Sequence, residues 1–130
     1  MDGATGRVHL NTIVVPVAAA PDPGVALEEA RNWIRTLKAP SGRILLVHVG
    51  DDASAPVLPE TSIPGWSQET VVLRGGSVVD RIPAYVSQVQ ADLVVLSAHT
   101  RHGWLGNLIG STGERILREV DCPVLVVPGE

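Results

Sequence analysis

Five short runs of apolar residues recur along the chain, and they predict its strands. The runs are rich in β-branched residues, and His48 is the one polar residue that interrupts an apolar stretch. This pattern is typical of strands that are buried on both faces of a parallel sheet. The runs cover residues 12–17, 44–49, 70–73, 92–96 and 123–127.

Apolar residues at helical spacing lie between most of these runs. A first helix is predicted from Asp22, which can cap it, and Pro23, which suits the first helical position, to about Lys38. Its apolar stripe is Leu27, Ala30, Ile34 and Leu37.

A second helix is predicted after Ser77 and Asp80, a pair that can form a reciprocal cap. Pro83 is expected to kink this helix or to delay its start. The stripe that would face the core is Val78, Val79, Ile82, Val86 and Val89.

A third helix is predicted to begin at Ser111, because Ser111 and Glu114 fit the S-x-x-E pattern of a capping box. It would carry Ile116, Leu117 and Val120 inward.

The segment 50–66, "GDDASAPVLPETSIPGW", breaks the alternation, since it has three prolines and no helical period. Right-handed crossovers would leave one face of the sheet short of a helix here. We therefore expect an irregular crossover whose apolar side chains pack down as a partial substitute. Those side chains are Val57, Leu58, Ile63 and Trp66.

Strands that alternate with helices predict an α/β fold with a mainly parallel, twisted sheet and helices on both faces. The 130 residues suit one domain, with residues 1–8 as a flexible tail. In such sheets, ligands bind beyond the carboxyl ends of the strands. The long loop after the fourth strand is therefore the candidate lining of a binding crevice.

Charge and composition exclude several classes of function. The net charge is −4, and the ten basic residues are scattered, which argues against binding to nucleic acid. No apolar stretch is long enough to cross a membrane, and the amino end lacks a signal-peptide pattern, so a cytoplasmic location is expected. Cys122 is the single cysteine, so no disulfide within the chain is expected, and a metal site at Cys122 would need His or carboxylate ligands as well. We expect a buried, inert thiol there.

The stretch "SAHTRHGWLGNLIGSTGERIL", residues 97–117, has features that favour phosphate. Gly110, Ser111 and Thr112 lie at a predicted helix start, where free N–H groups attract anions. Arg101, His99 and His102 could add positive charge.

Each of these residues also has a purely structural interpretation. Arg101 and His102 suit solvated loop positions, His99 could brace the loop, and Ser111 could act only as a cap. His48 lies inside an apolar run and suits a core or rim position, whereas Trp104 could mark a contact surface.

Four segments, in this order, resemble the universal stress protein family: "TIVVPV", "ILLVHVGD", "ADLVVLSAHTRHG" and "GSTGERILREVDCPVLVVP". The resemblance spans nearly the whole chain. It implies a five-stranded parallel sheet in the order 3-2-1-4-5, of the adenine nucleotide alpha hydrolase-like type. It also implies a homodimer that pairs the last strands, here 123–127. Many members of the family bind ATP, and others do not.

The resemblance also locates two departures from the nucleotide-binding pattern. Binding members carry Gly-x-x-Gly, nine residues, then Gly and Ser or Thr; the first two glycines fall on Ser97 and Thr100. Glycine there permits close approach and positive φ. Binders also place an aspartate two residues after the proline of the first strand, where this chain has Ala18.

Twelve candidate nucleotide-binding residues follow from the resemblance and from the predicted helix start. Val49 is the position whose backbone meets adenine in binding members. The full set is Pro16, Val17, Ala18, Val49, Leu96, Ser97, His99, Thr100, Arg101, Gly110, Ser111 and Thr112.

Together these features predict a regulatory, stress-response binding protein with a degenerate and weak nucleotide site. The ligand would be ATP, another adenine nucleotide or a phosphate-like anion. One alternative is a slow ATP hydrolase that uses His99 or His102 as base; another is a homodimeric module that docks a protein partner without nucleotide. No Walker loop, G-x-S-x-G turn or paired carboxylates occur, so no catalytic residue is assigned.

Overall fold

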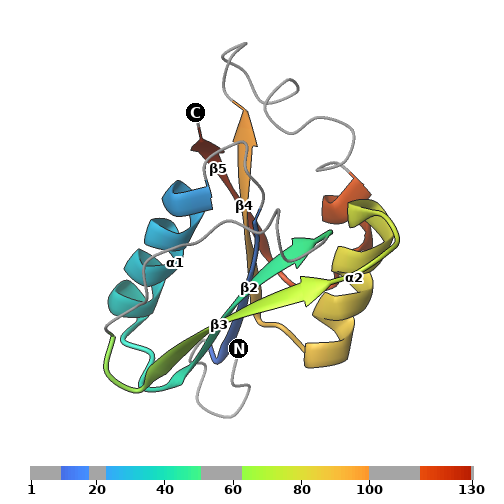
Figure 1. Cartoon of the computed structure of the whole chain (residues 1–130). Coiled ribbons are helices and arrows are strands. Elements are labelled where there is room, and N and C mark those ends of the chain that lie inside the picture. The colour runs from blue at the N-terminus through green and yellow to red at the C-terminus, as the bar shows by residue number, and fades with distance from the viewer. Residues whose placement is uncertain (1–9, 18–22, 51–62, 100–114, 130) are drawn as a thin grey trace.

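The fold is a parallel α/β sandwich, seen in a computed structural model that describes residues 10–17, 23–50, 63–99 and 115–129. Five parallel strands form one sheet in the order β3-β2-β1-β4-β5 (Figure 1). The strands are β1 (Thr12–Pro16), β2 (Gly42–Val49), β3 (Trp66–Leu73), β4 (Leu93–His99) and β5 (Val124–Gly129). This strand order confirms the predicted fold.

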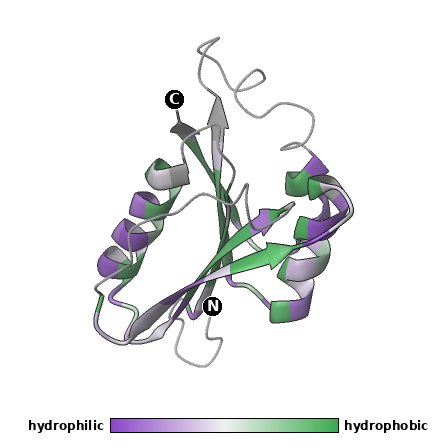
Figure 2. Ribbon diagram, viewed as in Figure 1, coloured by the Kyte–Doolittle hydropathy of each residue, from purple (hydrophilic) through white to green (hydrophobic). Residues whose placement is uncertain are grey.

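The helices cover the two faces of the sheet unequally. Helix α1 (Pro23–Leu37) lies on one face, and α2 (Val78–Val89) lies on the other together with the helical residues 115–119 (Figure 1). Hydrophobic positions concentrate in the central strands and on the inward faces of the helices (Figure 2). Two buried clusters result, one under α1 and one under α2.

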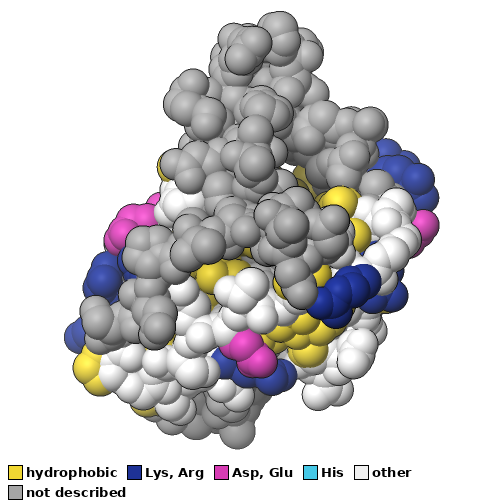
Figure 3. All heavy atoms as spheres, in the orientation of Figure 1, with side chains coloured by type: hydrophobic (Ala, Val, Ile, Leu, Met, Phe, Trp, Pro, Cys, Tyr) yellow, Lys and Arg dark blue, Asp and Glu magenta, His cyan; other side chains and the backbone are white. Residues whose placement is uncertain are grey.

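The surface mixes charges of both signs. Figure 3 shows Lys and Arg side chains interspersed with acidic ones and with small hydrophobic areas, without a broad region of one sign on the described part of this face. No helix among the described residues is both long and apolar enough to cross a bilayer.

Helix α2 begins as its capping residues predict. The Ser77 hydroxyl accepts a hydrogen bond from the backbone N–H of Asp80 at 3.3 Å and donates to the Asp80 carboxylate at 3.0 Å. Pro83 lies inside the helix and does not delay its start, because it removes only one backbone donor from a capped helix with a buried face.

Strand β3 is longer than its apolar run. It begins at Trp66, not at Thr70, because β3 is an edge strand that pairs with β2 over its whole length, and polar side chains such as Ser67 and Glu69 are exposed there. Trp66 is buried under α1, and its indole N–H donates to the carbonyl of Ala39 at 3.1 Å.

The crossover before β3 can be compared with its prediction only in part. Ile63 packs against the α1-side cluster and Trp66 is in it, as predicted, but Trp66 opens β3 and so does not belong to the crossover. Val57 and Leu58 lie outside the described residues.

Asp92 fastens the amino end of the central strand. Its Oδ2 accepts the backbone N–H groups of Asn11 at 2.9 Å and Thr12 at 2.8 Å, and its own N–H donates to the Thr12 carbonyl at 2.8 Å. The Asp92 carboxylate, which directly precedes β4, therefore takes the place of a backbone acceptor at the start of β1.

Replacing Asp92 with Ala should lower the free energy of unfolding by about 2 kcal/mol, because two backbone donors at a partly buried strand start lose an ionic acceptor. Urea denaturation measures the change. The exposed Asp121 offers a matched control, and Asp121→Ala should change stability far less. Equal effects of the two substitutions would contradict this role for Asp92.

Candidate functional site

The candidate site is at the carboxyl end of the sheet, where β1 and β4 are neighbours. The chain reverses its winding direction between these two strands, which is where open α/β sheets bind ligands. The β1–β4 pairing stops at Val14 and Val94, whereas β4 stays paired with β5 as far as His99. Figure 1 shows β4 and β5 diverging from β2 and β3 toward this end.

Pro16 explains why the β1–β4 pairing stops. The backbone groups of a parallel strand point alternately to its two neighbours. The Thr12 carbonyl accepts from Asp92 beside β4, so the even-numbered residues of β1 face β4. The next donor toward β4 would be residue 16, and proline has no N–H. The two strands therefore separate after Val14.

The backbone groups of β2, on the other side of β1, also point alternately to its two neighbouring strands. The N–H of Arg43 donates to the Asn11 carbonyl at 2.8 Å, whereas the N–H of Gly50 donates to the Leu73 carbonyl at 3.0 Å. Odd-numbered residues of β2 thus face β1, and even-numbered ones face β3. The backbone groups of Val49 are therefore directed to the β1 side, beyond Pro16, where β1 ends.

Val17, which directly follows β1, and His48, near the end of β2, are in contact. Val17 is 5% exposed, and its N–H donates to the Val47 carbonyl at 2.9 Å. The Nδ1 atom of His48 lies 3.1 Å from the Val17 carbonyl. His48 is 6% exposed, so it occupies the buried position at the end of a strand that its sequence context predicts.

Strand β4 reaches farther than its apolar run and takes in two of the candidate residues. Leu96 is buried, Ser97 is partly buried, and the backbone of β4 continues through His99. Ser97 therefore has an extended backbone, which any residue adopts. A glycine at position 97 would therefore not be needed for a positive φ. Its remaining advantage would be a closer approach of the backbone to a ligand.

Six of the twelve candidate residues lie within the described part of the chain, at or just after the ends of three strands. Pro16, Val17, Val49, Leu96, Ser97 and His99 occur at the carboxyl ends of β1, β2 and β4. The others lie outside the described residues, as do Asp22, His102, Trp104 and Glu114. They are Ala18, Thr100, Arg101, Gly110, Ser111 and Thr112.

Other chemistry is limited in the described part of the chain. It contains no group of three His, Cys, Asp or Glu side chains that could hold a metal ion. Cys122 is half-buried, and burial raises the pKa of its thiol, which lowers the fraction of reactive thiolate.

Two pockets at the opposite end of the sheet are not apparent from sequence. One, of about 380 Å³, is lined by Arg43, Gln90 and Asp92 among others, and a second, of about 330 Å³, lies between α2 and residues 119–122. In the first pocket, Asp92 Oδ2 is already occupied by two backbone N–H groups. The reversal of winding direction between β1 and β4, rather than either pocket, is the reason for placing the candidate site at the carboxyl end.

Comparisons with known proteins agree with this fold. The model of the Universal stress protein family matches residues 60–128. The universal stress protein UspA from Lactobacillus plantarum is 23% identical, with a TM-score of 0.63 and coverage of 92% of this chain and 98% of that one. A search of curated proteins finds no significant match.

Two further solved structures with this fold were determined with ligands. The universal stress protein from Archaeoglobus fulgidus in complex with dAMP is 17% identical, with a TM-score of 0.57. A universal stress protein in complex with cAMP is 18% identical, with a TM-score of 0.59. In each case the match covers 92% of this chain and 98% of the other.

Replacing Pro16 with Ala tests the cause of the strand separation. The substitution supplies an N–H directed toward β4, so the β1–β4 pairing should extend by one hydrogen bond to the Val95 carbonyl. In NMR amide exchange, the new residue 16 amide should then be strongly protected, like those of Val14 and Val15. An amide at position 16 that exchanges like an exposed one would show that something other than the missing N–H separates the strands.

Proposed function

The chain belongs to the universal stress protein family, and from this premise we propose that it is a regulatory binding protein with a weak adenine-nucleotide site between β1 and β4. The observation that carries the proposal is the end of the β1–β4 pairing at Val14 and Val94, at the point where the chain reverses its winding direction. Both ligands named with the related structures, cAMP and dAMP, combine an adenine ring with a phosphate.

The weakness of the site follows from three residues. Ser97 and Thr100 stand where binding members of the family carry glycines, and Ala18 stands where they carry an aspartate. The two larger side chains take space beside the ligand, and the alanine removes a polar contact. Each lost hydrogen bond is worth about 0.5–1.5 kcal/mol, so two or three losses weaken binding on the order of a hundredfold.

An anion would still be held at the phosphate end of the site. The support for this is chemical: Gly110 and Ser111 fit the start of a helix, where backbone N–H groups bind anions whatever the side chains, and Arg101 adds charge. Phosphate or sulfate should therefore compete with the nucleotide.

Calorimetry with ATP tests the proposed site. The wild-type protein should bind weakly or not measurably, and the triple variant Ser97→Gly, Thr100→Gly, Ala18→Asp should bind about a hundredfold more tightly than wild type, because space and a polar contact are restored. Low-micromolar binding by the wild-type protein, with no gain in the triple variant, would contradict the degenerate site.

The same protein samples distinguish the alternatives. Phosphate release with time would indicate the slow hydrolase. Absence of binding even by the triple variant would favour a docking module that works without nucleotide.

A second copy of the chain is the partner that we propose, paired through residues 123–127. The support lies in the edge strand β5. The N–H of Val94 donates to the Pro123 carbonyl at 3.0 Å, so alternation directs the backbone groups of Val124 and Val126 away from β4, toward the open edge of the sheet. Such a row of backbone groups invites pairing with another strand.

Sedimentation at micromolar concentration tests the homodimer. The wild-type protein should sediment as a dimer and Val126→Lys as a monomer, because two lysines would meet near the two-fold axis. Val25→Lys is the matched control, since Val25 is an exposed valine on α1 and should not change the assembly. A wild-type monomer that the Val126 change leaves unaltered would exclude this interface.

A further inference from the structure

Three polar residues form a row at the amino end of the sheet, on the face that α2 covers. Strand alternation puts Arg43 on the same face as Leu45, which belongs to the α2-side cluster. Thr12 shares that face with Val14 in the same way. Thr12 is the register partner of Arg43 and is joined to Asp92 by two hydrogen bonds. Arg43, Thr12 and Asp92 therefore make up a polar row across neighbouring strands.

The polar row and the carboxyl end of α2 border a pocket of about 380 Å³, a volume within the range of small-molecule sites. Asn11, Val89 and the C-cap residue Gln90 line it together with the polar row. Of these described lining residues, Val89 alone is apolar. Helix α2 has no basic residue in its last turn, so its own side chains do not offset the partial negative charge of this end.

Arg43 and Asp92 bring opposite charges to the pocket without pairing with each other. The Nε atom of Arg43 donates to the Oγ1 atom of the buried Thr12 at 3.4 Å, which directs the side chain toward β1 and leaves its two terminal nitrogens for another partner. Asp92 accepts two backbone N–H groups through Oδ2, which leaves Oδ1. Among the described residues, no ion pair includes Arg43 or Asp92. Neutral groups thus orient both charges.

We propose that this pocket is a binding site for a free α-amino acid. Arg43 binds the carboxylate of the ligand, because a guanidinium can donate two parallel N–H bonds to a carboxylate. Asp92 Oδ1 and the carboxyl end of α2 attract its ammonium group. Asp92 repels a simple anion and Arg43 repels a simple cation, so the pocket favours a small molecule that carries both charges.

The remaining lining residues suit a polar side chain on the ligand. Asn11 and Gln90 contribute carboxamides, which can both donate and accept hydrogen bonds. A glutamine side chain, itself a carboxamide, complements them.

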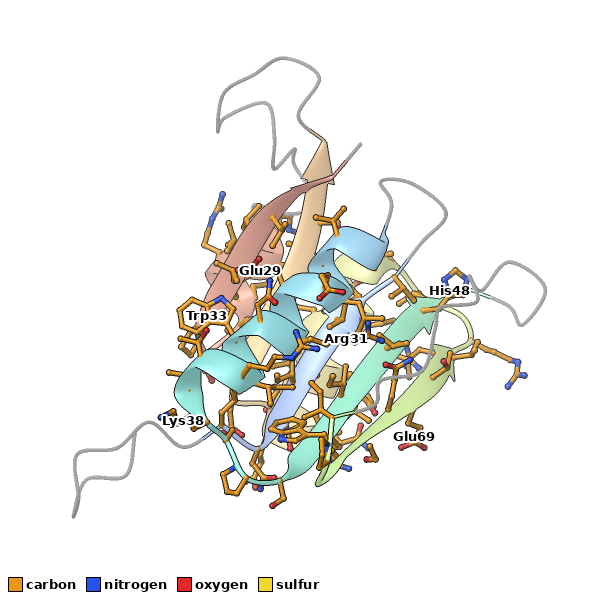
Figure 4. The ribbon with its side chains drawn as sticks, turned by 90° about the vertical axis from the view of Figure 1, so that its left-hand side faces the viewer. Glu29, Arg31, Trp33, Lys38, His48 and Glu69 are labelled. Atoms are coloured by element: carbon orange, nitrogen blue, oxygen red, sulfur yellow. The ribbon has the colours of Figure 1, made fainter. Side chains whose placement is uncertain are left out.

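The pocket is separate from the proposed nucleotide site. Figure 4 shows His48 near the carboxyl end of β2, whereas Arg43 is the second residue of that strand. The two sites therefore lie at opposite ends of the sheet, and an amino acid can bind whether or not a nucleotide does.

NMR titration of the full chain with L-glutamine and with L-alanine tests the pocket. The amide signals of Thr12, Arg43 and Asp92 should shift and saturate at millimolar concentration or below with at least one of them. Acetate and ethylammonium each supply one of the two charged groups, so each should bind at least about tenfold more weakly, the effect of one lost charge-assisted hydrogen bond. No saturable shift with either amino acid would overturn the proposal. Acetate that binds as tightly would also overturn it, since the pocket would then select only an anion.

Arg43→Met and Asp92→Asn test the two charged groups separately. Methionine keeps an unbranched chain at an exposed position and removes the charge, so the fold should be retained. Asparagine keeps one oxygen to accept the N–H groups of Asn11 and Thr12, and it replaces the other oxygen with a donor. Each substitution should weaken binding of the amino acid at least about tenfold.

Arg35→Met and Asp121→Asn are the matched controls. Both residues are exposed, neither lines the pocket, and Arg35 lies on α1, over the other face of the sheet. Neither control should change the affinity, and thermal unfolding without ligand should show that all four variants fold. Unchanged affinity in Arg43→Met, or an equal loss in the controls, would overturn the site. If Asp92→Asn fails to fold, the comparison of Arg43→Met with Arg35→Met still decides.

Discussion

The alternation of backbone hydrogen bonds along β1 is the constraint on which the rest of the structure depends. This five-residue strand lies in the middle of the sheet, so its odd-numbered residues must satisfy β2 and its even-numbered residues must satisfy β4. A buried backbone group without a partner is costly. At the two ends of β1, where a neighbouring strand no longer supplies partners, other groups must satisfy the backbone.

At each end, a side chain takes the place of a backbone partner. Asp92 accepts the two N–H groups that start β1, and His48 meets the carbonyl of Val17, just after β1 ends. Pro16 has no N–H, so it cannot donate the hydrogen bond that would continue the pairing with β4. The pairing of β1 with β4 thus ends early because the last residue of the short central strand has no N–H to donate to β4.

Much of the fold could be predicted from the sequence, because buried parallel strands and amphipathic helices leave strong apolar patterns. The patterns failed where a strand is not buried. Strand β3 is an edge strand whose first half has polar residues, and β4 continues past its apolar run through Ser97 to His99. Edge and terminal residues are held by backbone bonds, which side-chain patterns do not record.

The candidate site was only partly accessible to sequence reasoning. The resemblance to the family indicated Pro16, Val17 and Val49, but not the direction of their backbone groups, which only the register reveals. The sequence does not indicate which groups His48 and Asp92 contact. Asp92 and Thr12 are far apart in the sequence and meet only when β4 is placed beside β1.

The fastening of β1 at Asp92 lies at the opposite end of the sheet from Ser97, which is near the end of β4. Substitutions at Ser97 therefore do not touch the bonds that hold the start of the central strand in place. Function depends on the residues placed on a fold rather than on the fold itself, so the residues at the carboxyl end of this sheet can change while the frame keeps its stability.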